Sequence, residues 1–389
     1  FEEINWRFGL KCGDEILKQF SRCMQSCINE NQKIYELGNG RFMIMDLVNH
    51  SKEDILELYD ELKKSIEVAL EENAYRMVYT ISVGIVEIDK EMQDYDTLIK
   101  YSEFALNEAK KKGKNSCYFF TQDKYKQFIR RREIRVGLQN AVDHNFKNFD
   151  VYYQPIIDIH TRNLIGAEAL MRFKMKRNEQ IEFVSPAEFI PILEESGLII
   201  PTGRWILRQA VACCKKWQEF IPEFKVNVNL SYVQIIKSRI LDEIKQALKD
   251  YNLKPALLGI EVTESGYLEN TYHYKKLWSS LKEEGITLVL DDYGTGYSNA
   301  YRLSNLTPHY IKIDRVLTQK ALSSNYERSI LIYIIEMAHS LKLNVCIEGV
   351  ETEEELQEIK KLNPDYIQGY LFGKPAPEDE FYNRQIKKK

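Results

Sequence analysis

The sequence has little of what zinc sites, disulfide scaffolds and membrane spans require. Its 389 residues include only six histidines and seven cysteines, and the cysteines are scattered without a metal-ligand spacing. Reduced thiols are therefore expected rather than disulfides. No apolar stretch approaches the ~18 residues of a membrane-spanning helix. No signal peptide is visible either.

The chain also lacks an excess of positive charge. Lysine and arginine number 54 against 58 aspartates and glutamates, which gives a net charge of −4. This balance excludes an overall basic surface for duplex nucleic acid, so an anionic substrate would need local cations or metal ions. The first residue is Phe1 rather than Met, and we expect the sequence to be part of a longer protein. A cytoplasmic location is expected, with membrane attachment through preceding sequence left open.

What the second half of the chain does contain is a recurring acidic residue at the end of a short apolar run. Each run is typical of a buried strand, and a carboxylate at its end is costly to bury unless a cation compensates it. The acidic positions are Glu168, Glu261, Glu264, Asp291, Asp292 and Glu348, and polar partners at similar positions are Asn229, Lys312, Asp314 and Gln368. Converging ends would form an oxygen-rich site, which favours Mg²⁺ or Mn²⁺ over zinc.

The strand pattern predicts how these ends converge. Eight strand candidates follow residue 149, and helical patterns separate most of them: 151–158, 164–171, 225–230, 258–264, 287–292, 310–313, 344–348 and 366–369. This order predicts an α/β fold, a (β/α)₈ barrel, in which functional residues lie at the carboxyl ends of the strands. Only residues 159–163, which include the HTRN segment, separate the first two candidates, so we expect that pair to be antiparallel.

Two further segments precede the barrel. Residues 1–120 alternate strand and amphipathic-helix patterns and predict a separate α/β domain. Residues 121–148 are charged and helix-prone, with Ile134 and Leu138 interleaved with arginines. We interpret them as a linker helix that packs one face on a domain, and a nucleic-acid patch is the weaker alternative.

An adjacent pair of aspartates suits a two-metal site. Asp291 could bridge two ions while Asp292 favours the second, and such ions activate water and neutralise a phosphodiester. Lys312 could then orient the water or stabilise charge on the phosphate. For any one of these residues, a helix cap or a surface carboxylate is the alternative.

The motifs at these positions also resemble a known family, the EAL-domain cyclic-di-GMP phosphodiesterases. The similar segments extend over about residues 149–380 and are YYQPIIDIHTRNLIGAEALMRF, VNVNLS, IEVTES, LDDYGTGYSN, IKID, IEGVET and QGYLFGKPAP. The resemblance implies a modified TIM barrel over residues 149–389 that opens cyclic-di-GMP to linear pGpG with two Mg²⁺ or Mn²⁺ ions. It also implies a homodimer.

The resemblance assigns roles to individual residues. It implies metal ligands at Glu168, Asn229, Glu261 and Asp291, with Asp292 on the second ion and Gln368 and Asp314 completing the surroundings. Lys312 and Glu348 would hold or deprotonate the attacking water, and Gln154 and Arg172 would contact the nucleotide. Glu264 would anchor the loop after the aspartate pair, and Glu351 matches an acidic position near the site. The departures are Tyr293, Ile347 and His309, where the family commonly has Phe, a small residue and an acidic residue; none removes a proposed ligand.

Residues 1–120 resemble a truncated GGDEF (diguanylate cyclase) domain through FEEINWRFGLKCGDEIL, YTISVGI and FALNEAKKKGKN. The signature itself is replaced by residues 38–42, so that Gly40 and Arg41 stand where the metal-binding and catalytic acids are needed. Without those acids we expect no cyclase activity. The family's inhibitory product site is expected to be absent too, because Asn29 and Gln32 replace its RxxD motif.

The role of this first domain stays open between two hypotheses. Asn5 and Asp14 match the pair that recognises guanine, and Arg41 could contact phosphate in place of a metal. One hypothesis is therefore a GTP-sensing regulatory domain. The other is a relic that packs, dimerises or transmits a signal. For the whole chain, the alternative to an enzyme is a module that binds cyclic-di-GMP without cleaving it.

Overall fold

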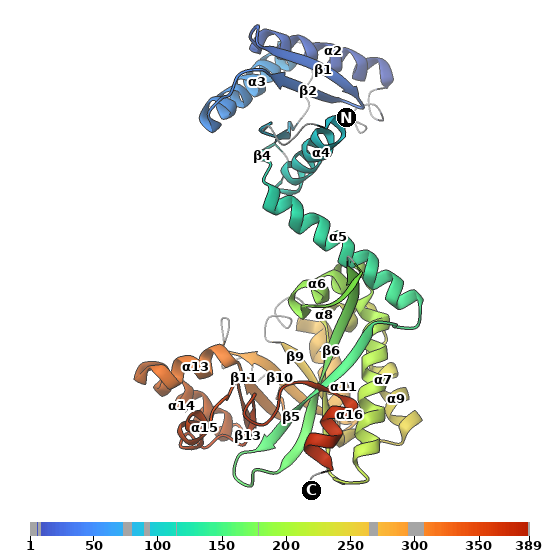
Figure 1. Cartoon of the computed structure of the whole chain (residues 1–389), viewed down its shortest axis with the longest axis vertical. Helices are drawn as coiled ribbons and strands as arrows, with labels where there is room; N and C mark the ends of the chain where they lie inside the picture. Colours follow the sequence, from blue (N-terminus) through green and yellow to red (C-terminus); the bar gives the residue numbers. More distant parts are fainter. Residues whose placement is uncertain are drawn as a thin grey trace. The chain divides into compact units, whose positions relative to one another are not determined.

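The computed structural model of the chain describes residue 6 and residues 9–72, 80–88, 94–113, 115–177, 179–263, 271–294 and 307–387. Asn5 and Glu264, two of the predicted site residues, lie outside these ranges. The chain divides into two compact units, Phe1–Ile129 and Arg130–Lys389 (Figure 1). None of the described helices combines the length and the apolar character that crossing a bilayer requires.

The first unit is the predicted α/β domain. Its elements are α2 (Leu10–Cys27), β1 (Gln32–Gly38), β2 (Arg41–Asp46), α3 (Lys52–Glu72), β3 (Val83–Ile85), α4 (Tyr95–Lys111) and β4 (Cys117–Phe119). Strands β1 and β2 form an antiparallel hairpin, whereas β3 and β4 pair in parallel. Asn39 and Gly40 both have positive φ in the hairpin turn. Such turns favour Asn-Gly, so the residues that replace the cyclase signature still form a tight turn.

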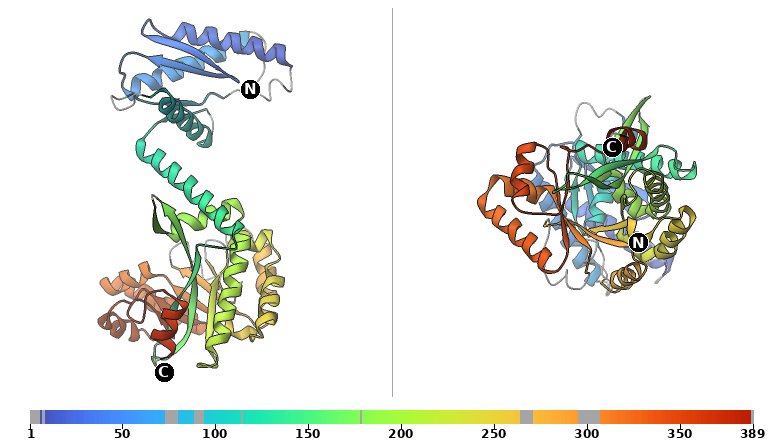
Figure 2. Two further views of the ribbon diagram at one scale, coloured as in Figure 1. Left: turned by 45° about the vertical axis from the view of Figure 1, so that its right-hand side comes forward. Right: turned by 90° about the horizontal axis from the view of Figure 1, so that it is seen from below.

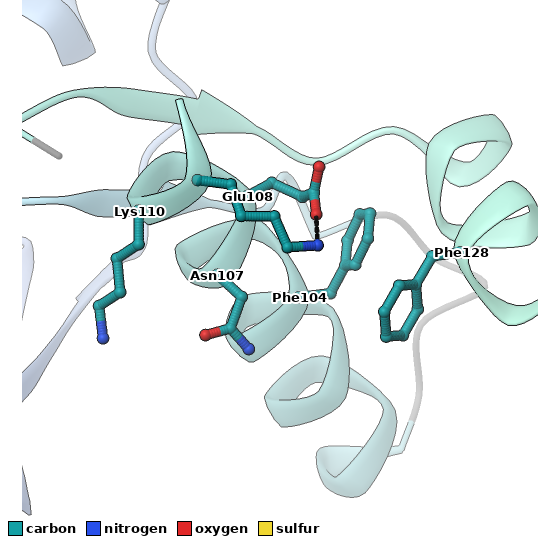
Figure 3. Close-up of a pocket in the computed structure, with 6 residues that line it drawn as sticks. Phe104, Asn107, Glu108, Lys110 and Phe128 are labelled. Atoms are coloured by element: carbon teal, nitrogen blue, oxygen red, sulfur yellow. Dashed lines mark hydrogen bonds and ion pairs between the residues drawn. The ribbon is translucent and has the colours of Figure 1, made fainter. Parts of the chain in front are cut away.

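Helix α5 (Gln122–Asp143) begins in the first unit and ends in the second, and it covers most of the segment for which the sequence predicts a helix. Near its start, Phe128 packs on Phe104 of α4 with 5.1 Å between ring centroids, beside a small pocket of about 390 Å³ (Figure 3). Further along, Ile134 and Leu138 are buried. Arg130 donates to Glu188 at 3.1 Å. These contacts favour a packed structural helix over a nucleic-acid patch.

The second unit is a closed barrel. Its strands are β5 (Phe149–Asp158), β6 (Leu164–Arg177), β7 (Gln180–Val184), β8 (Lys225–Asn229), β9 (Leu258–Thr263), β10 (Thr287–Tyr293), β11 (Tyr310–Ile313), β12 (Asn344–Glu348), β13 (Tyr366–Gln368) and β14 (Ala376–Pro377). Eight of them close in the order β5-β6-β8-β9-β10-β11-β12-β13 and back to β5. Strand β5 is antiparallel to both neighbours, and the remaining barrel pairs are parallel. The barrel and its antiparallel first pair are confirmed.

Helices cover the outside of the barrel (Figure 2). They are α6 (Pro186–Ser196), α7 (Ile199–Trp217), α8 (Tyr232–Lys237), α9 (Ile240–Tyr251), α11 (Thr271–Glu283), α13 (Arg315–Ser323), α14 (Asn325–Ser340), α15 (Glu353–Lys360) and α16 (Glu378–Phe381). The core lies between strands and helices, where Trp217 of α7 stacks on Phe381 of α16 at 4.8 Å. Strands buried on both faces have sequences that are apolar runs, as in residues 288–290 of β10.

Candidate active site

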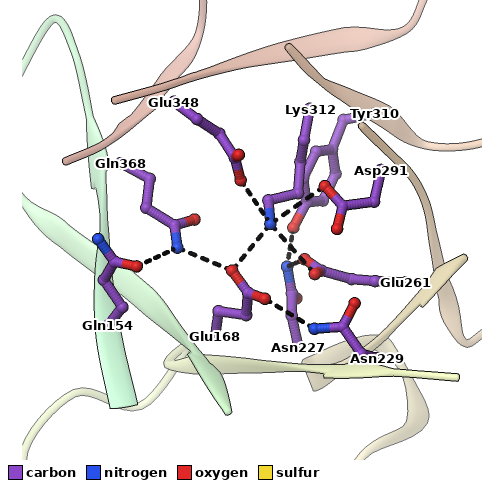
Figure 4. Close-up of polar contacts among 10 residues, drawn as sticks. All are labelled: Gln154, Glu168, Asn227, Asn229, Glu261, Asp291, Tyr310, Lys312, Glu348 and Gln368. Atoms are coloured by element: carbon purple, nitrogen blue, oxygen red, sulfur yellow. Dashed lines mark hydrogen bonds and ion pairs between the residues drawn. The ribbon is translucent and has the colours of Figure 1, made fainter. Parts of the chain in front are cut away.

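Lys312 of β11 lies at the centre of four carboxylates (Figure 4). Its Nζ atom lies 2.8 Å from Glu168, 3.1 Å from Glu261, 3.4 Å from Asp291 and 2.7 Å from Glu348. Glu261, Asp291 and Glu348 lie at or near the carboxyl ends of β9, β10 and β12, and Glu168 lies on β6, where it pairs with Asn227 of β8. Closing the barrel thus brings together five of the residues that the sequence predicted. We refer to these five residues as the Lys312 cluster.

The charges of this cluster do not balance. Four ionised carboxylates around one ammonium leave three negative charges (4 − 1 = 3). Burial raises the pKa of Glu261 and Asp291, and the charge of Glu168 raises both further. Burial alone would lower the pKa of Lys312, but the surrounding carboxylates outweigh it and raise that pKa well above its ordinary value. The site therefore favours additional cations.

Three of the acids are placed to bind such a cation. Glu168, Glu261 and Asp291 are buried, and each offers an oxygen within 4.8 Å of the others. Two buried atoms of the site, Oδ1 of Asp291 and Oε1 of Gln368, form no hydrogen bond within the described part of the chain, although Oδ1 of Asp291 lies 3.4 Å from Nζ of Lys312. A set of oxygen donors with unused acceptor capacity fits a hard divalent cation.

Three predicted amide side chains surround Glu168. Asn229 donates from Nδ2 to Oε1 of Glu168 at 2.7 Å. Gln368 donates from Nε2 to Oε2 of Glu168 at 2.8 Å and to Oε1 of Gln154 at 3.0 Å. Both oxygens of Glu168 are thus held by neutral donors, which orients its carboxylate toward Lys312.

Asp292 occupies a bulge at the end of β10. Its neighbour β11 pairs first with Leu290 and next with Tyr293, so one extra residue is accommodated on β10. Asp292 adopts a positive φ of 56°, a conformation that costs on the order of 1–3 kcal/mol for a non-glycine residue. Burial raises its pKa to about 6, and the charges of Asp291 and Asp314 contribute. The bulge lets two consecutive aspartates both reach the carboxyl end of the barrel.

Three other predicted residues have different partners. Asp314 caps α13 by accepting from the backbone amide of Val316 at 2.7 Å. Glu351 pairs with Arg315 at 2.8 Å. The guanidinium of Arg172 lies over the ring of Tyr152, 5.5 Å from its centroid. Within the described residues, Asp314, Glu351 and Arg172 form no hydrogen bond or ion pair with the Lys312 cluster.

Two residues that the sequence did not single out also contact this site. Asn227 of β8, which is buried, donates from Nδ2 to Oε1 of Glu261 at 2.7 Å and also to the hydroxyl of Tyr310. A Cβ at Gly259 would lie 2.1 Å from Oδ1 of Asn227, so glycine leaves room for this amide. The available signal was the period of two in VNVNLS, because Asn227 and Asn229 share one face of a strand.

In the first unit, the two described residues that were predicted to bind GTP, Asp14 and Arg41, are not in contact with each other. Asp14 is exposed on α2. Arg41 pairs with Glu103 of α4 at 3.2 Å, and its side chain is 42% exposed. No contact joins Arg41 to Asp14 among the residues described.

Two family models match this chain. The EAL domain model matches residues 135–375, and the model of the diguanylate cyclase, GGDEF domain, matches residues 1–116. The signalling protein YkoW of Bacillus subtilis is 31% identical over 386 residues, which cover 98% of this chain and 47% of that protein. The cyclic di-GMP phosphodiesterase PdeR of Escherichia coli is 28% identical over 397 residues, which cover all of this chain and 58% of that protein. The chain spans about half the length of these curated relatives.

Solved structures match the second unit in particular. The PaMucR phosphodiesterase in complex with c-di-GMP has 28% identity and a TM-score of 0.60, covering 64% of this chain and 99% of that one. The FimX EAL domain from Pseudomonas aeruginosa, bound to c-di-GMP, has 25% identity and a TM-score of 0.56, covering 62% of this chain and 96% of that one.

Proposed function

Because this chain belongs to the EAL domain family, we propose that it is a metal-dependent phosphodiesterase that hydrolyses cyclic-di-GMP to linear pGpG. The observation that carries the proposal is the buried Glu168–Glu261–Asp291 cluster around Lys312 at the carboxyl end of the barrel. Relatives named as cyclic di-GMP phosphodiesterases and a neighbouring structure in complex with c-di-GMP support the choice of substrate.

In this proposal Glu168, Asn229, Glu261 and Asp291 hold one Mg²⁺ or Mn²⁺ ion, and Asp292 holds a second. Bound ions of this kind polarise a phosphoryl oxygen and lower the pKa of water. Asp314 and Gln368 support these ligands. The raised pKa of Asp292 makes this carboxylate easy to protonate when no cation is bound, so we expect binding of the second cation to strengthen as pH rises through about 6.

In this proposal Lys312 stabilises negative charge and Glu348 accepts a proton. Lys312 stays protonated because the four carboxylates raise its pKa, and its ammonium can stabilise negative charge on the phosphate. Glu348 is the most accessible of the four acids, with 19% of its side chain exposed. It takes a proton from the attacking water as the new P–O bond forms, and the P–O3′ bond breaks with O3′ taking up a proton from solvent to leave as a hydroxyl. Burial raises its pKa to about 8, so its ionised form is a stronger base and the ionised fraction grows as pH rises toward 8.

Gln154 and Arg172 are the proposed substrate contacts. Arg172 is partly buried on β6, the charge of Glu168 acts on it, and it forms no ion pair with an acid among the described residues. Its guanidinium is thus available for a phosphate or a guanine edge. Gln368 links Gln154 to Glu168, which would couple nucleotide position to the metal ligands. Glu264 and Glu351 are positioning residues in this proposal. The proposal also includes a homodimer.

Chromatography of the protein after incubation with cyclic-di-GMP and Mg²⁺ or Mn²⁺ tests the proposal. We expect pGpG from the unaltered chain and from Glu219→Gln, a control at an exposed acid, and none from Asp291→Asn. Equal conversion by Asp291→Asn would overturn the proposed site. Binding without conversion under either metal would instead support the alternative, a receptor, for which the c-di-GMP-bound FimX EAL domain is a precedent for binding.

For the first unit, we propose a domain without cyclase activity that binds GTP through Asn5, Asp14 and Arg41 and regulates hydrolysis. Gly40 and Arg41 supply no carboxylate in the hairpin turn, so they cannot bind the cations that cyclisation needs. The exposure of Arg41 leaves its guanidinium available to a phosphate. A packing or dimerising relic remains the competing hypothesis, and titration with GTP separates the two.

A further inference from the structure

A second pocket lies at the other end of the barrel from the Lys312 cluster. Its volume is about 560 Å³, which is within the usual size of small-molecule sites. Five of its lining residues are the first residues of their strands: Lys225 of β8, Thr287 of β10, Tyr310 of β11, Asn344 of β12 and Tyr366 of β13. It therefore opens at the amino-terminal mouth of the barrel, which the proposed hydrolysis does not use. We call it the amino-terminal pocket.

The charged side chains of this pocket are all lysines. Lys225, Lys282, Lys342 and His309 line it, and no aspartate or glutamate does. None of the three lysines forms an ion pair with another described residue, and Lys282 donates to the hydroxyl of Thr307 at 3.1 Å. The whole chain carries a net charge of −4, so this concentration of positive charge is local. A cationic concavity of this kind raises the local concentration of anions.

His309 adds a neutral donor to the lysines. Its Nδ1 atom accepts the backbone N–H of Leu288 at 2.9 Å, which leaves Nε2 to carry the proton. Burial lowers the pKa of His309, and the positive charges of Lys282 and Lys225 lower it further. An acidic residue at this position would have placed a negative charge in the pocket, whereas the neutral imidazole leaves the positive potential intact.

The rest of the wall is largely apolar and aromatic. The rings of Tyr310 and Tyr366 meet edge to face with 5.7 Å between centroids. Ile156 and Ile165 line the pocket beside them. A surface that joins aromatic area to several cations suits a molecule with a planar or apolar body and a phosphate group.

A short chain of polar contacts joins this pocket to the active site. Tyr310 and Asn227 both line the pocket, and Asn227 donates to the Tyr310 hydroxyl and to Glu261 (Figure 4). Glu261 in turn lies 3.1 Å from the ammonium of Lys312. One buried side chain, Asn227, is thus in contact with both ends of the barrel interior.

We propose that the amino-terminal pocket binds a small phosphate-bearing molecule, and that Tyr310 and Asn227 couple its occupancy to the position of Glu261. The binding half stands on the pocket alone. The coupling half rests on the proposed hydrolysis, because turnover is its readout.

Calorimetric titration of the intact chain with AMP, adenosine and inorganic pyrophosphate tests the binding half. AMP avoids the guanine recognition proposed for the first unit. We expect AMP to bind at least about tenfold more tightly than either adenosine or pyrophosphate, since each of these lacks one of the two groups that the pocket favours. Lys282→Gln and His309→Asp should each weaken AMP about tenfold, whereas Asp291→Asn should leave its affinity unchanged.

Three results would overturn the binding half. The first is the absence of any binding heat with AMP or pyrophosphate. The second is an AMP affinity of Lys282→Gln and His309→Asp that equals that of the wild type. The third is the loss of AMP affinity in Asp291→Asn. The last result would place AMP in the active site instead. None of these measurements needs turnover, so they remain decisive even if the chain does not hydrolyse cyclic-di-GMP.

The coupling half is tested by the rate of pGpG formation with and without saturating AMP. We expect AMP to change the rate at least about twofold in the unaltered chain, a small coupling energy. Tyr310→Phe removes the hydroxyl that contacts Asn227 and should abolish this effect while AMP still binds. An AMP effect that persists in Tyr310→Phe, or an unaltered rate in the wild type at full AMP occupancy, would rule out this route. If the chain forms no pGpG when AMP is not added, that result would count against the proposed hydrolysis. The result of the AMP binding experiment would still stand.

Discussion

Glu348 makes the shortest of the four carboxylate contacts to Lys312, with 2.7 Å between Oε1 and Nζ. It is also the most exposed of the four acids, whereas Lys312 is 1% exposed. The pair thus extends from the buried centre of the cluster to its accessible side, where water and substrate can enter.

Glu348→Gln is therefore expected to slow pGpG formation by roughly a hundredfold or more, because the amide cannot accept the proton of the attacking water. Binding of cyclic-di-GMP should persist, since the change removes one negative charge near an anionic ligand. Chromatography of products and calorimetry of binding measure the two quantities. Glu219→Gln is the matched control at an exposed acid. Hydrolysis at the wild-type rate in Glu348→Gln would exclude Glu348 as the base.

Lys312→Met should destabilise the metal-free protein by about 3–5 kcal/mol, because it leaves buried carboxylates without their cation. The carboxylates with raised pKa values bind protons more readily when folded, so the deficit should grow as pH rises from 6 to 8. Saturating Mg²⁺ or Mn²⁺ should recover part of it. Urea unfolding with and without metal measures the effect, with Lys249→Met at an exposed site as the control. A deficit that is unaffected by metal would contradict cation binding by this cluster.

Gly259→Ala should lower the free energy of unfolding by about 1–3 kcal/mol and should also lower turnover. The added Cβ would lie 2.1 Å from Oδ1 of Asn227, and it would therefore displace the amide that holds Glu261. Gly137→Ala is the matched control in the middle of α5. There the Cβ would meet Phe173 at 3.4 Å, and a gain of about 0.5–1 kcal/mol is expected from helix propensity. Urea unfolding and product chromatography measure both variants. Equal stability in the two variants would show that Asn227 does not need this space.

His309 should make the stability of the protein depend on pH. Its pKa is lowered in the folded protein from 6.5, first by burial and then by Lys282 and Lys225. As pH falls below 6.5, the unfolded chain therefore takes up the proton first, and stability is lost. Relative to His309→Gln, the wild type should lose stability between pH 7.5 and 5.5, as followed by urea unfolding, with His160→Gln at an exposed histidine as the control. Parallel pH profiles of wild type and His309→Gln would contradict the neutral imidazole.

GTP should alter the rate of pGpG formation without being converted to cyclic-di-GMP. Arg41→Ala should abolish the rate change, because the exposed guanidinium is the proposed phosphate contact. Glu103→Gln, which releases Arg41 from its partner, should leave the effect in place or enlarge it. Absence of GTP binding, or GTP binding without any effect on turnover, would leave the first unit as a structural relic.

The strands and helices of the barrel could be predicted because their patterns are local. Apolar runs such as residues 288–290 identify buried strands, and the order of strands and helices leaves few topologies open. The carboxyl ends of parallel strands meet at one mouth, so the proximity of Glu168, Glu261, Asp291 and Glu348 followed from topology alone. The helical stretch after residue 121 followed in the same way from composition.

Other parts of the site depend on distances that no local pattern encodes. That Lys312 lies among four carboxylates, and that Asp292 occupies a bulge with positive φ, depends on how β10 and β11 pair. Asn227 and Tyr310 were missed because an asparagine and a tyrosine in a strand are ordinary residues until the barrel places Asn227 against Glu261 and Tyr310 against Asn227. Asp314, Arg172 and Glu351 share motifs with the clustered acids, yet their contacts described above are with other residues, since adjacency in a motif does not fix where a side chain points.

The sequence by itself determined the closed α/β barrel, the mouth at which its acids gather and the loss of the cyclase signature, because each depends on residue type and period along the chain. Only the tertiary structure decided which carboxylates surround Lys312, that Asn227 holds Glu261, and that a basic pocket lies at the opposite mouth of the barrel. Those features depend on strand register and barrel closure, which bring together residues more than a hundred positions apart, as with Lys312 and Glu168.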